Sequence, residues 1–328
     1  MYKYVLFTHN DMDGAGCRIV FHLAHRNALV GDMLIEHCTY KDIDEKVQAR
    51  LEEMNPEETE LVFADITPSI NMAWALQASG YKVKIFDHHV TAYPLQQVFP
   101  DAVIVPENEL GIMQSGTSLI YQYYSKLGWI DAWIDPQKEG LLAELVDTIR
   151  AYDTYEWKEK DNLKAKRLQT MFFMLGMERF VDKYMQRIIS EYPSDLILDT
   201  ELEFIDARID REKEIIANFS VDDLVTLETG GYKIALVIYS KGASISELAC
   251  EFLAKNPDYD FMVGFSLAQY GKLELRSATD EIDVSKIAQK LGGGGHRRAS
   301  GANLPSYIYS GIVEGIADLL DDALNSDE

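Results

Sequence analysis

The chain has 328 residues, of which 47% are hydrophobic and 26% charged, so it is long enough for two globular domains with their own cores. The formal net charge of −23 argues against a protein that coats long DNA or RNA, because such a protein needs a basic surface to neutralise phosphates. No apolar run reaches about 18 residues and no signal-peptide pattern is present, so we expect neither a membrane span nor secretion. The three cysteines are scattered and suggest neither a disulfide framework nor a metal pair, which favours the reducing cytoplasm.

Strands and helices alternate in the first third of the chain. Strands are expected at 2–9, 33–40, 60–67, 82–89 and 102–106. Helices are expected at 14–28, from about 41 to 54, and from a cap at Pro68 and Ser69 onward. Near-continuous apolar strands joined by helices predict an α/β fold, in which a parallel sheet has helices on both faces.

The rest of the chain is predicted to be helical first and then mixed. Helices are expected at 115–127, 136–151, 163–190 and 200–219, and a hairpin around Gly230 and Gly231. They are followed by a helix at 244–255, strands at 260–268 and 272–277, and helices at 283–291 and 306–324. We therefore expect a first domain over 1–190, a helical linker over 191–221, and a smaller α/β domain with a mixed sheet over 222–328.

Carboxylates and imidazoles gather where the predicted strands end. These side chains are His9, Asp11 and Asp13 after the first strand, Asp65 after the third, and Asp87, His88 and His89 after the fourth, with Asp153 at a helix end. The carboxyl ends of parallel strands meet at one edge of the sheet, which is where such folds bind ligands. An aspartate at a strand end is more often a turn or helix-cap residue, and Asp65 alone would be read so. The joint arrangement favours a metal site.

The composition of this group predicts the kind of metal. Several carboxylates close together cannot all stay ionised without a cation. Oxygen ligands with one or two imidazoles suit manganese or magnesium better than zinc. The group is larger than one ion needs, and two ions about 3.5–4 Å apart are common in phosphoester hydrolysis. We therefore expect two divalent ions, with Mn²⁺ first and Mg²⁺ or Co²⁺ as alternatives.

These motifs, taken in order, resemble the DHH phosphoesterase superfamily. The resemblance rests on His9, Asp11, Asp13 and Gly14 in THNDMDG, on Asp65, on Asp87, His88 and His89 in DHH, and on Asp153. Residues 273–301, LELRSATDEIDVSKIAQKLGGGGHRRASG, are similar to the DHH-associated domain of that superfamily. The single residue between His9 and Asp11, and the sequence YDTYEW, favour the nanoRNase B-like branch.

The resemblance implies a role for each matching residue. One ion would be held by His9, Asp11 and Asp65, and the other by Asp13, Asp65, His88 and Asp153, with Asp65 as the bridge. A water bridging both ions would attack phosphorus. His89 would face the phosphate, and Asp87 would orient a histidine. Because neighbouring residues of a strand point to opposite sides, we expect His88 and His89 to be directed to different tasks.

A glycine cluster near the C-terminus predicts a substrate site. Glycines let backbone N–H groups approach an anion, and arginine binds phosphate through two N–H groups. The expected substrate-binding residues are His89, Arg276, Ser277, Gly293, Gly294, Gly295, His296 and Arg297. A plain helix stop would need only one glycine. Arg298 is adjacent to Arg297, so only one of the two is expected to face the ligand, in a cleft between the domains.

The predicted function is a metal-dependent phosphodiesterase that degrades short oligonucleotides to mononucleotides, RNA more than DNA. Other substrates stay open, namely cyclic dinucleotides, their linear products, and 3′-phosphoadenosine 5′-phosphate. Pyrophosphate hydrolysis would not need a nucleotide pocket, and a processive exonuclease would need a more basic surface. A nucleotide-binding sensor with a decayed site is the alternative outside enzymes. Long nucleic acid and membranes are not expected as partners, and a homodimer stays open.

Overall fold

The computed structural model describes residues 1–130, 136–190, 195–238, 244–266, 271–305, 307–308, 310–311 and 314–315. The chain divides into two compact units, Met1–Arg208 and Ile209–Glu328. The division falls inside helix α9 (Asp199–Asn218), within the segment expected as a linker. Most of the helix expected at 306–324 lies outside the described residues.

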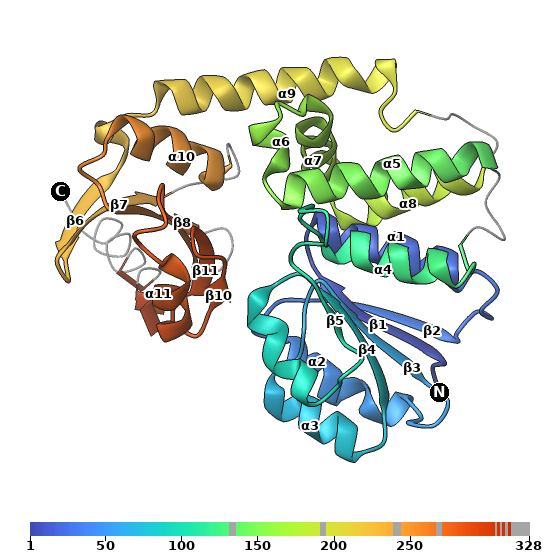
Figure 1. The fold of residues 1–328 in the computed structure, drawn as a ribbon. Helices are drawn as coiled ribbons and strands as arrows, with labels where there is room; N and C mark the ends of the chain where they lie inside the picture. The colour runs from blue at the N-terminus through green and yellow to red at the C-terminus, as the bar shows by residue number, and fades with distance from the viewer. Residues whose placement is uncertain are drawn as a thin grey trace, which may run out of the picture. The chain divides into compact units, whose positions relative to one another are not determined.

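The first unit is built on a parallel sheet, as predicted (Figure 1). Its strands are β1 (Tyr4–His9), β2 (Met33–Cys38), β3 (Glu60–Ala64), β4 (Lys82–Asp87) and β5 (Val103–Ile104). Their order across the sheet is β2-β1-β3-β4-β5, and every neighbouring pair is parallel. All five carboxyl ends therefore lie at one edge.

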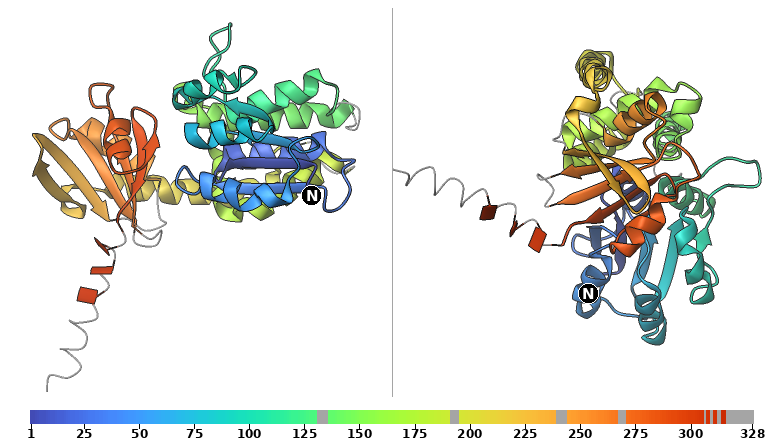
Figure 2. Two further views of the ribbon diagram at one scale, coloured as in Figure 1. Left: turned by 90° about the horizontal axis from the view of Figure 1, so that it is seen from below. Right: turned by 90° about the vertical axis from the view of Figure 1, so that its left-hand side faces the viewer.

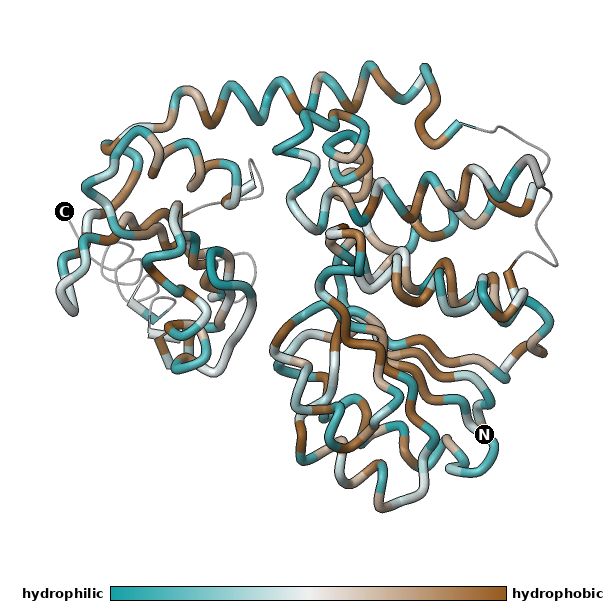
Figure 3. The backbone as a smooth tube through the Cα atoms, viewed as in Figure 1, coloured by the Kyte–Doolittle hydropathy of each residue, from teal (hydrophilic) through white to brown (hydrophobic). Residues whose placement is uncertain are grey.

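Helices cover both faces of this sheet, so its strands are apolar on both sides (Figures 1 and 3). On one face lie α1 (Met12–Ala24) and α4 (Gly116–Lys126). On the other lie α2 (Ile43–Arg50) and α3 (Ile70–Ala78), and the short helices η1 (Leu51–Glu53) and η2 (Val90–Gln97) follow α2 and β4 in the chain. Phe7 and Phe63, on adjacent strands, are fully buried and stack with ring centroids 5.4 Å apart. A buried, packed core therefore supports the strand ends.

A helical layer packs behind α1 and α4. It contains α5 (Pro136–Asp153), α6 (Glu156–Glu159), α7 (Leu163–Leu175) and α8 (Met177–Ile189). The expectation of one helix over 163–190 is wrong, because Gly176 has φ +74° and separates α7 from α8. Each described helix is too short or too polar to cross a bilayer.

The second unit contains a six-stranded sheet of order β10-β11-β9-β8-β7-β6 (Figure 2). The strands are β6 (Val225–Thr229), β7 (Tyr232–Ile238), β8 (Phe261–Ser266), β9 (Lys272–Arg276), β10 (Gly294–Gly295) and β11 (Ala299–Asn303). The sheet is mixed, because β7 and β8 are parallel while the other pairs are antiparallel. Its helices are η3 (Val221–Asp223), α10 (Ile245–Lys255) and α11 (Val284–Lys290). Among the described strands of this unit, only β10 and β11 were not expected, and the short helix η3 was not expected either.

Candidate metal centre

The sheet edge brings together the acids and histidines expected there. His9 is the last residue of β1, and Asp11 caps α1 by accepting a hydrogen bond from the Gly14 N–H at 2.9 Å. Asp65 directly follows β3, and Asp87 ends β4. Asp153 ends α5, which belongs to the helical layer. Three strands and two helices thus supply the site.

One group of possible ligands is His9, Asp11 and Asp65. One ligand atom from each lies within 4.8 Å of the others. His9 Nδ1 is 2.6 Å from Asp11 Oδ2 and 3.9 Å from Asp65 Oδ2. This is the set predicted for one ion.

A second group is Asp13, His88 and Asp153, whose ligand atoms also lie within 4.8 Å of one another. His88 Nε2 is 3.3 Å from Asp153 Oδ2 and 3.4 Å from Asp65 Oδ1. The two oxygens of Asp65 therefore face different groups, Oδ2 toward His9 and Oδ1 toward His88. That placement is what a bridging carboxylate requires.

Asp65 has an unusual backbone conformation. Its φ is +61°, in the left-handed region, and its N–H donates to the Phe86 carbonyl at 2.9 Å. A Cβ at Gly116 would lie 2.5 Å from the Asp65 Cβ, so only glycine fits at that position without movement. Strained backbone that the surroundings hold in place is common at functional sites.

Asp13 is tied to the start of α4. Its carboxylate accepts hydrogen bonds from the N–H groups of Gly116 at 2.7 Å and Thr117 at 3.0 Å. The Thr117 hydroxyl donates to the Asp13 carbonyl at 2.7 Å. Gly14 follows, and a Cβ there would lie 1.9 Å from the His9 carbonyl oxygen. The residues of THNDMDG thus have structural tasks as well as a place among the possible ligands.

The electrostatics of the group show carboxylate repulsion. Burial, and then the charges of Asp13 and Asp11, raise the pKa of Asp65 and of Asp153 well above the ordinary value. Burial disfavours the charged forms of both Asp11 and His9. Their mutual attraction is stronger, so the pKa of Asp11 is lowered and the pKa of His9 is raised. A bound cation would relieve this repulsion.

Two buried oxygens fit a cation. Asp65 Oδ2 and Asp153 Oδ2 receive no hydrogen bond from the described part of the chain. A buried polar atom without a partner is costly, and a bound divalent ion would satisfy both oxygens. The mixture of carboxylates and imidazoles suits Mn²⁺ or a similar ion.

The two adjacent histidines have different partners although their rings lie close together. The His89 N–H and Nδ1 contact Asp87 Oδ1 at 2.8 and 2.7 Å, whereas His88 faces Asp65 and Asp153. The ring centroids are only 4.1 Å apart, and Asp65, His88 and His89 form a third group within 4.8 Å. Strand alternation does not separate the rings, because β4 ends at Asp87 before either histidine.

Burial and charge also distinguish Asp87 from the possible ligands. Burial alone would raise its pKa, but His89 and its hydrogen bonds lower it, so this carboxylate stays ionised. An ionised Asp87 accepting from Nδ1 leaves Nε2 as the His89 nitrogen directed away from it.

Several residues at this edge were missed from the sequence. Tyr40, two residues after β2, places its hydroxyl 3.3 Å from His89 Nε2. His37 Nδ1 contacts the His9 carbonyl at 2.8 Å, and burial lowers the pKa of His37, so the neutral ring donates. Arg18 lies 3.5 Å from His37 and forms a two-point ion pair with Glu178. The sequence signal that could have identified them was the presence of a histidine and a tyrosine near the end of β2.

In the second unit, Arg276 and Ser277 lie at the end of β9. Arg276 Nε donates to the Ser246 hydroxyl at 2.8 Å, and its Nη1 donates to the carbonyls of Leu275 and Ser300. Ser277 is buried, and its hydroxyl donates to the Thr279 carbonyl at 2.8 Å. The arginine is held in place by its neighbours, and the serine hydroxyl closes a local turn.

The glycine cluster builds the β10–β11 hairpin. A Cβ at Gly293 would lie 2.0 Å from the Gly301 carbonyl oxygen, and Gly295 has φ +131°, so both have a structural reason to be glycine. Gly294 has open space around it. His296 donates its N–H to the Ala299 carbonyl. Arg297 donates to the Asp280 carbonyl at 2.8 Å and is about half exposed.

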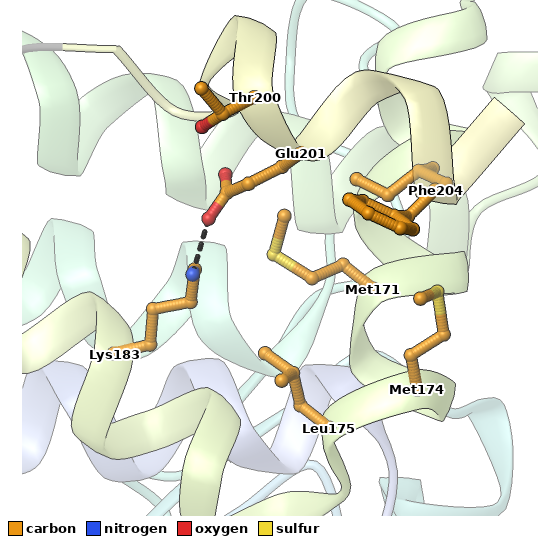
Figure 4. A pocket seen from close by; sticks show the side chains of 8 residues that line it. Met171, Met174, Leu175, Lys183, Thr200, Glu201 and Phe204 are labelled. Carbon is orange, nitrogen blue, oxygen red and sulfur yellow. Dashed lines mark ion pairs between the residues drawn. The ribbon is translucent and has the colours of Figure 1, made fainter.

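An apolar pocket of about 190 Å³ lies apart from this edge, between α7, α8 and α9 (Figure 4). Lys183 and Glu201 form an ion pair beside it. Its lining residues are Met171, Met174, Leu175, Lys183, Thr200, Glu201, Phe204 and Ile205. None of them belongs to the ligand groups above, so the pocket is separate from the metal centre.

Comparison with known proteins identifies relatives of this chain. The family described as DHHA1 domain matches residues 231–326. Oligoribonuclease NrnB of Bacillus subtilis (strain 168) is 31% identical over 323 residues, covering 94% of this chain and 75% of that protein. A 3′,5′-cyclic-nucleotide phosphodiesterase of Helicobacter pylori (strain ATCC 700392 / 26695) is 24% identical, covering 96% of this chain and 98% of that protein.

A solved structure shares the fold. RecJ from Thermus thermophilus, in complex with Mn²⁺, superposes with a TM-score of 0.51 at 15% identity, over 94% of this chain and 50% of RecJ. The chain therefore belongs to the DHH phosphoesterase superfamily, as the motifs indicated. Within that superfamily it falls on the branch of oligoribonuclease NrnB.

Proposed function

We propose that the protein is a metal-dependent phosphodiesterase that removes mononucleotides from very short oligonucleotides, RNA more than DNA. One observation carries the proposal: Asp65 faces two ligand groups at once in a chain 31% identical to an oligoribonuclease over 94% of its length. The first group is His9, Asp11 and Asp65, and the second is Asp13, Asp65, His88 and Asp153. The ion we propose is Mn²⁺, with Mg²⁺ or Co²⁺ as alternatives.

The residues at the sheet edge have different roles in the proposed mechanism. Two divalent ions bound there would supply a water nucleophile at neutral pH and stabilise negative charge on the phosphoryl oxygens. Asp87 holds the His89 ring through Nδ1, so that Nε2 is the ring nitrogen directed to the substrate phosphate. His37 fixes the end of β1 through the His9 carbonyl.

In the second unit we propose Arg276, Ser277, Gly293, Gly294, Gly295, His296 and Arg297 as contacts to the terminal nucleotide. The guanidinium of Arg276 is oriented by three oxygens, and its side chain is mostly buried, which suits a preorganised anion contact. The free cysteines suit a cytoplasmic enzyme.

A substrate panel in Mn²⁺ tests the proposal. It contains labelled RNA of 2 to 10 nucleotides, a 40-mer, cyclic dinucleotides and 3′-phosphoadenosine 5′-phosphate. We expect kcat/KM to fall steeply with length, because the net charge of −23 disfavours long polyanions. Undiminished cleavage of the 40-mer would overturn the short-substrate proposal. Faster turnover of a cyclic dinucleotide would favour the alternative that cyclic dinucleotides are the substrate.

The Arg276→Ala variant tests the nucleotide contact. A hydrogen bond to a charged group contributes about 1.5–3 kcal/mol, so KM for a dinucleotide should rise about 10- to 100-fold. KM for a simple aryl phosphodiester, which has no second nucleotide, should change little. Arg298→Ala is the matched control, because Nε and Nη2 of Arg298 both donate to the Asp280 carboxylate. Equal effects on both substrates would remove Arg276 from the nucleotide contact.

A further inference from the structure

Tyr40 is held at the same sheet edge as the possible ligands. Strand β2 pairs in parallel with β1, with Cys38 opposite His9, and Tyr40 follows two residues later. The turn is fixed, because the Thr39 N–H donates to Asp42 Oδ1 at 2.7 Å and the Asp42 N–H donates to the Thr39 carbonyl at 3.2 Å. The end of β2 thus places the Tyr40 phenol at this edge of the sheet.

The Tyr40 ring lies between two histidines of the site. Its centroid is 5.4 Å from that of His9, at an interplanar angle of 46°, and 6.1 Å from that of His89, nearly perpendicular at 84°. Its hydroxyl is 3.3 Å from His89 Nε2. The residue is 42% exposed, so part of it can meet an incoming substrate.

The hydroxyl lies where a phosphate oxygen would bind. Asp87 takes Nδ1 of His89, so Nε2 is the ring nitrogen that can reach a substrate. A phosphate oxygen in contact with Nε2 must come within about 3 Å of it, next to the phenol. Tyr40 is neutral at physiological pH, since tyrosine has an ordinary pKa near 10, so its O–H is a donor that does not compete with carboxylates for a cation.

We propose that Tyr40 is a catalytic residue whose hydroxyl donates a hydrogen bond to a non-bridging oxygen of the scissile phosphate, beside Nε2 of His89. This inference rests on the proposed phosphodiesterase function. A preorganised donor aimed at developing negative charge stabilises the transition state more than the ground state. Tyr40 therefore acts on kcat, whereas a ring that only stacked on a base would act on the KM of nucleotides.

The Tyr40→Phe variant removes the hydroxyl and keeps the ring against His9. We expect kcat to fall about 10- to 100-fold for a dinucleotide and for an aryl phosphodiester alike, from the loss of one hydrogen bond to a charged group. Mn²⁺ affinity, measured by calorimetry, should stay within about twofold. Tyr93→Phe is the control, because Tyr93 is 44% exposed in the same unit and lies on η2.

A binding measurement separates this inference from the proposed function. Adenosine 5′-monophosphate is titrated into Mn²⁺-loaded wild type and Tyr40→Phe. If the wild type cleaves none of the substrates, the proposed function fails, and an affinity at least about fivefold weaker in Tyr40→Phe still supports the phosphate contact. Unchanged kcat and unchanged affinity would overturn the Tyr40 assignment. So would a loss confined to the dinucleotide, since that indicates base stacking alone.

Discussion

The Asp65→Asn variant is expected to lose at least about 10³-fold in kcat, because the bridge contributes about 4 kcal/mol or more to stabilising transition-state charge. Asp65 faces His9 with one oxygen and His88 with the other, so its loss affects both ligand groups. Asparagine keeps the size of the side chain and tolerates the left-handed backbone at φ +61°. Asp65→Asn therefore tests the loss of the carboxylate alone. Asp65→Ala would also add backbone strain at this position.

The measurement is single-turnover cleavage of a labelled dinucleotide in saturating Mn²⁺. Asp101→Asn, at an exposed aspartate before β5, is the matched control and should behave as the wild type. Asp65→Asn should also make the metal-free protein more stable, since it removes a carboxylate from a group that repels itself. Turnover near the wild-type rate would contradict the two-metal arrangement.

Removal of metal should abolish turnover and lower Tm, more at pH 8 than at pH 5. Asp65 and Asp153 have raised pKa values in the metal-free fold, and so does His9. The folded state then binds more protons than the unfolded state, so stability falls as pH rises from the ordinary aspartate value of 3.8 through these raised values. A divalent cation replaces those protons and cancels the loss.

Melting curves in chelator and in Mn²⁺, from pH 5 to pH 8, check this dependence. Ligand at 100 times its Kd adds about 2.7 kcal/mol, or about 5–10 °C in Tm for a unit of this size. The increase in Tm on adding Mn²⁺ should become larger as pH rises. It should be smaller in Asp65→Asn than in the wild type, and unchanged in Asp101→Asn. A gain that is the same at both ends of the pH range would show that these carboxylates do not govern ion binding.

The sheet and most of the metal centre could be predicted because parallel strands carry a simple rule. Three apolar strands had acids or histidines just after them or at their ends, and carboxyl ends meet at one edge. The rule needed no knowledge of side-chain geometry to bring His9, Asp65 and His88 together. Strand alternation did not explain the placement of the two histidines, because β4 ends at Asp87 before either of them.

What was missed depended on contacts that leave no pattern in the sequence. Tyr40 looks like any aromatic residue in a turn until β2 is placed beside β1. Strands β10 and β11 contain glycine, alanine, serine and asparagine, which carry no strand signal, and form because Gly293 allows close backbone approach. A lone glycine inside a helical pattern is often tolerated, so the break at Gly176 was not predictable either.

The hydrogen bonds of Asp13 to the start of α4 affect how relatives of this protein should be interpreted. A descendant that had lost catalysis could replace Asp65 with asparagine and gain stability. It could not easily replace Asp13, because the N–H groups of Gly116 and Thr117 would lose their acceptor. Selection for folding alone would therefore preserve Asp13. An intact DxDG motif in a related chain is thus poor proof of activity, and the residue after β3 is the better diagnostic.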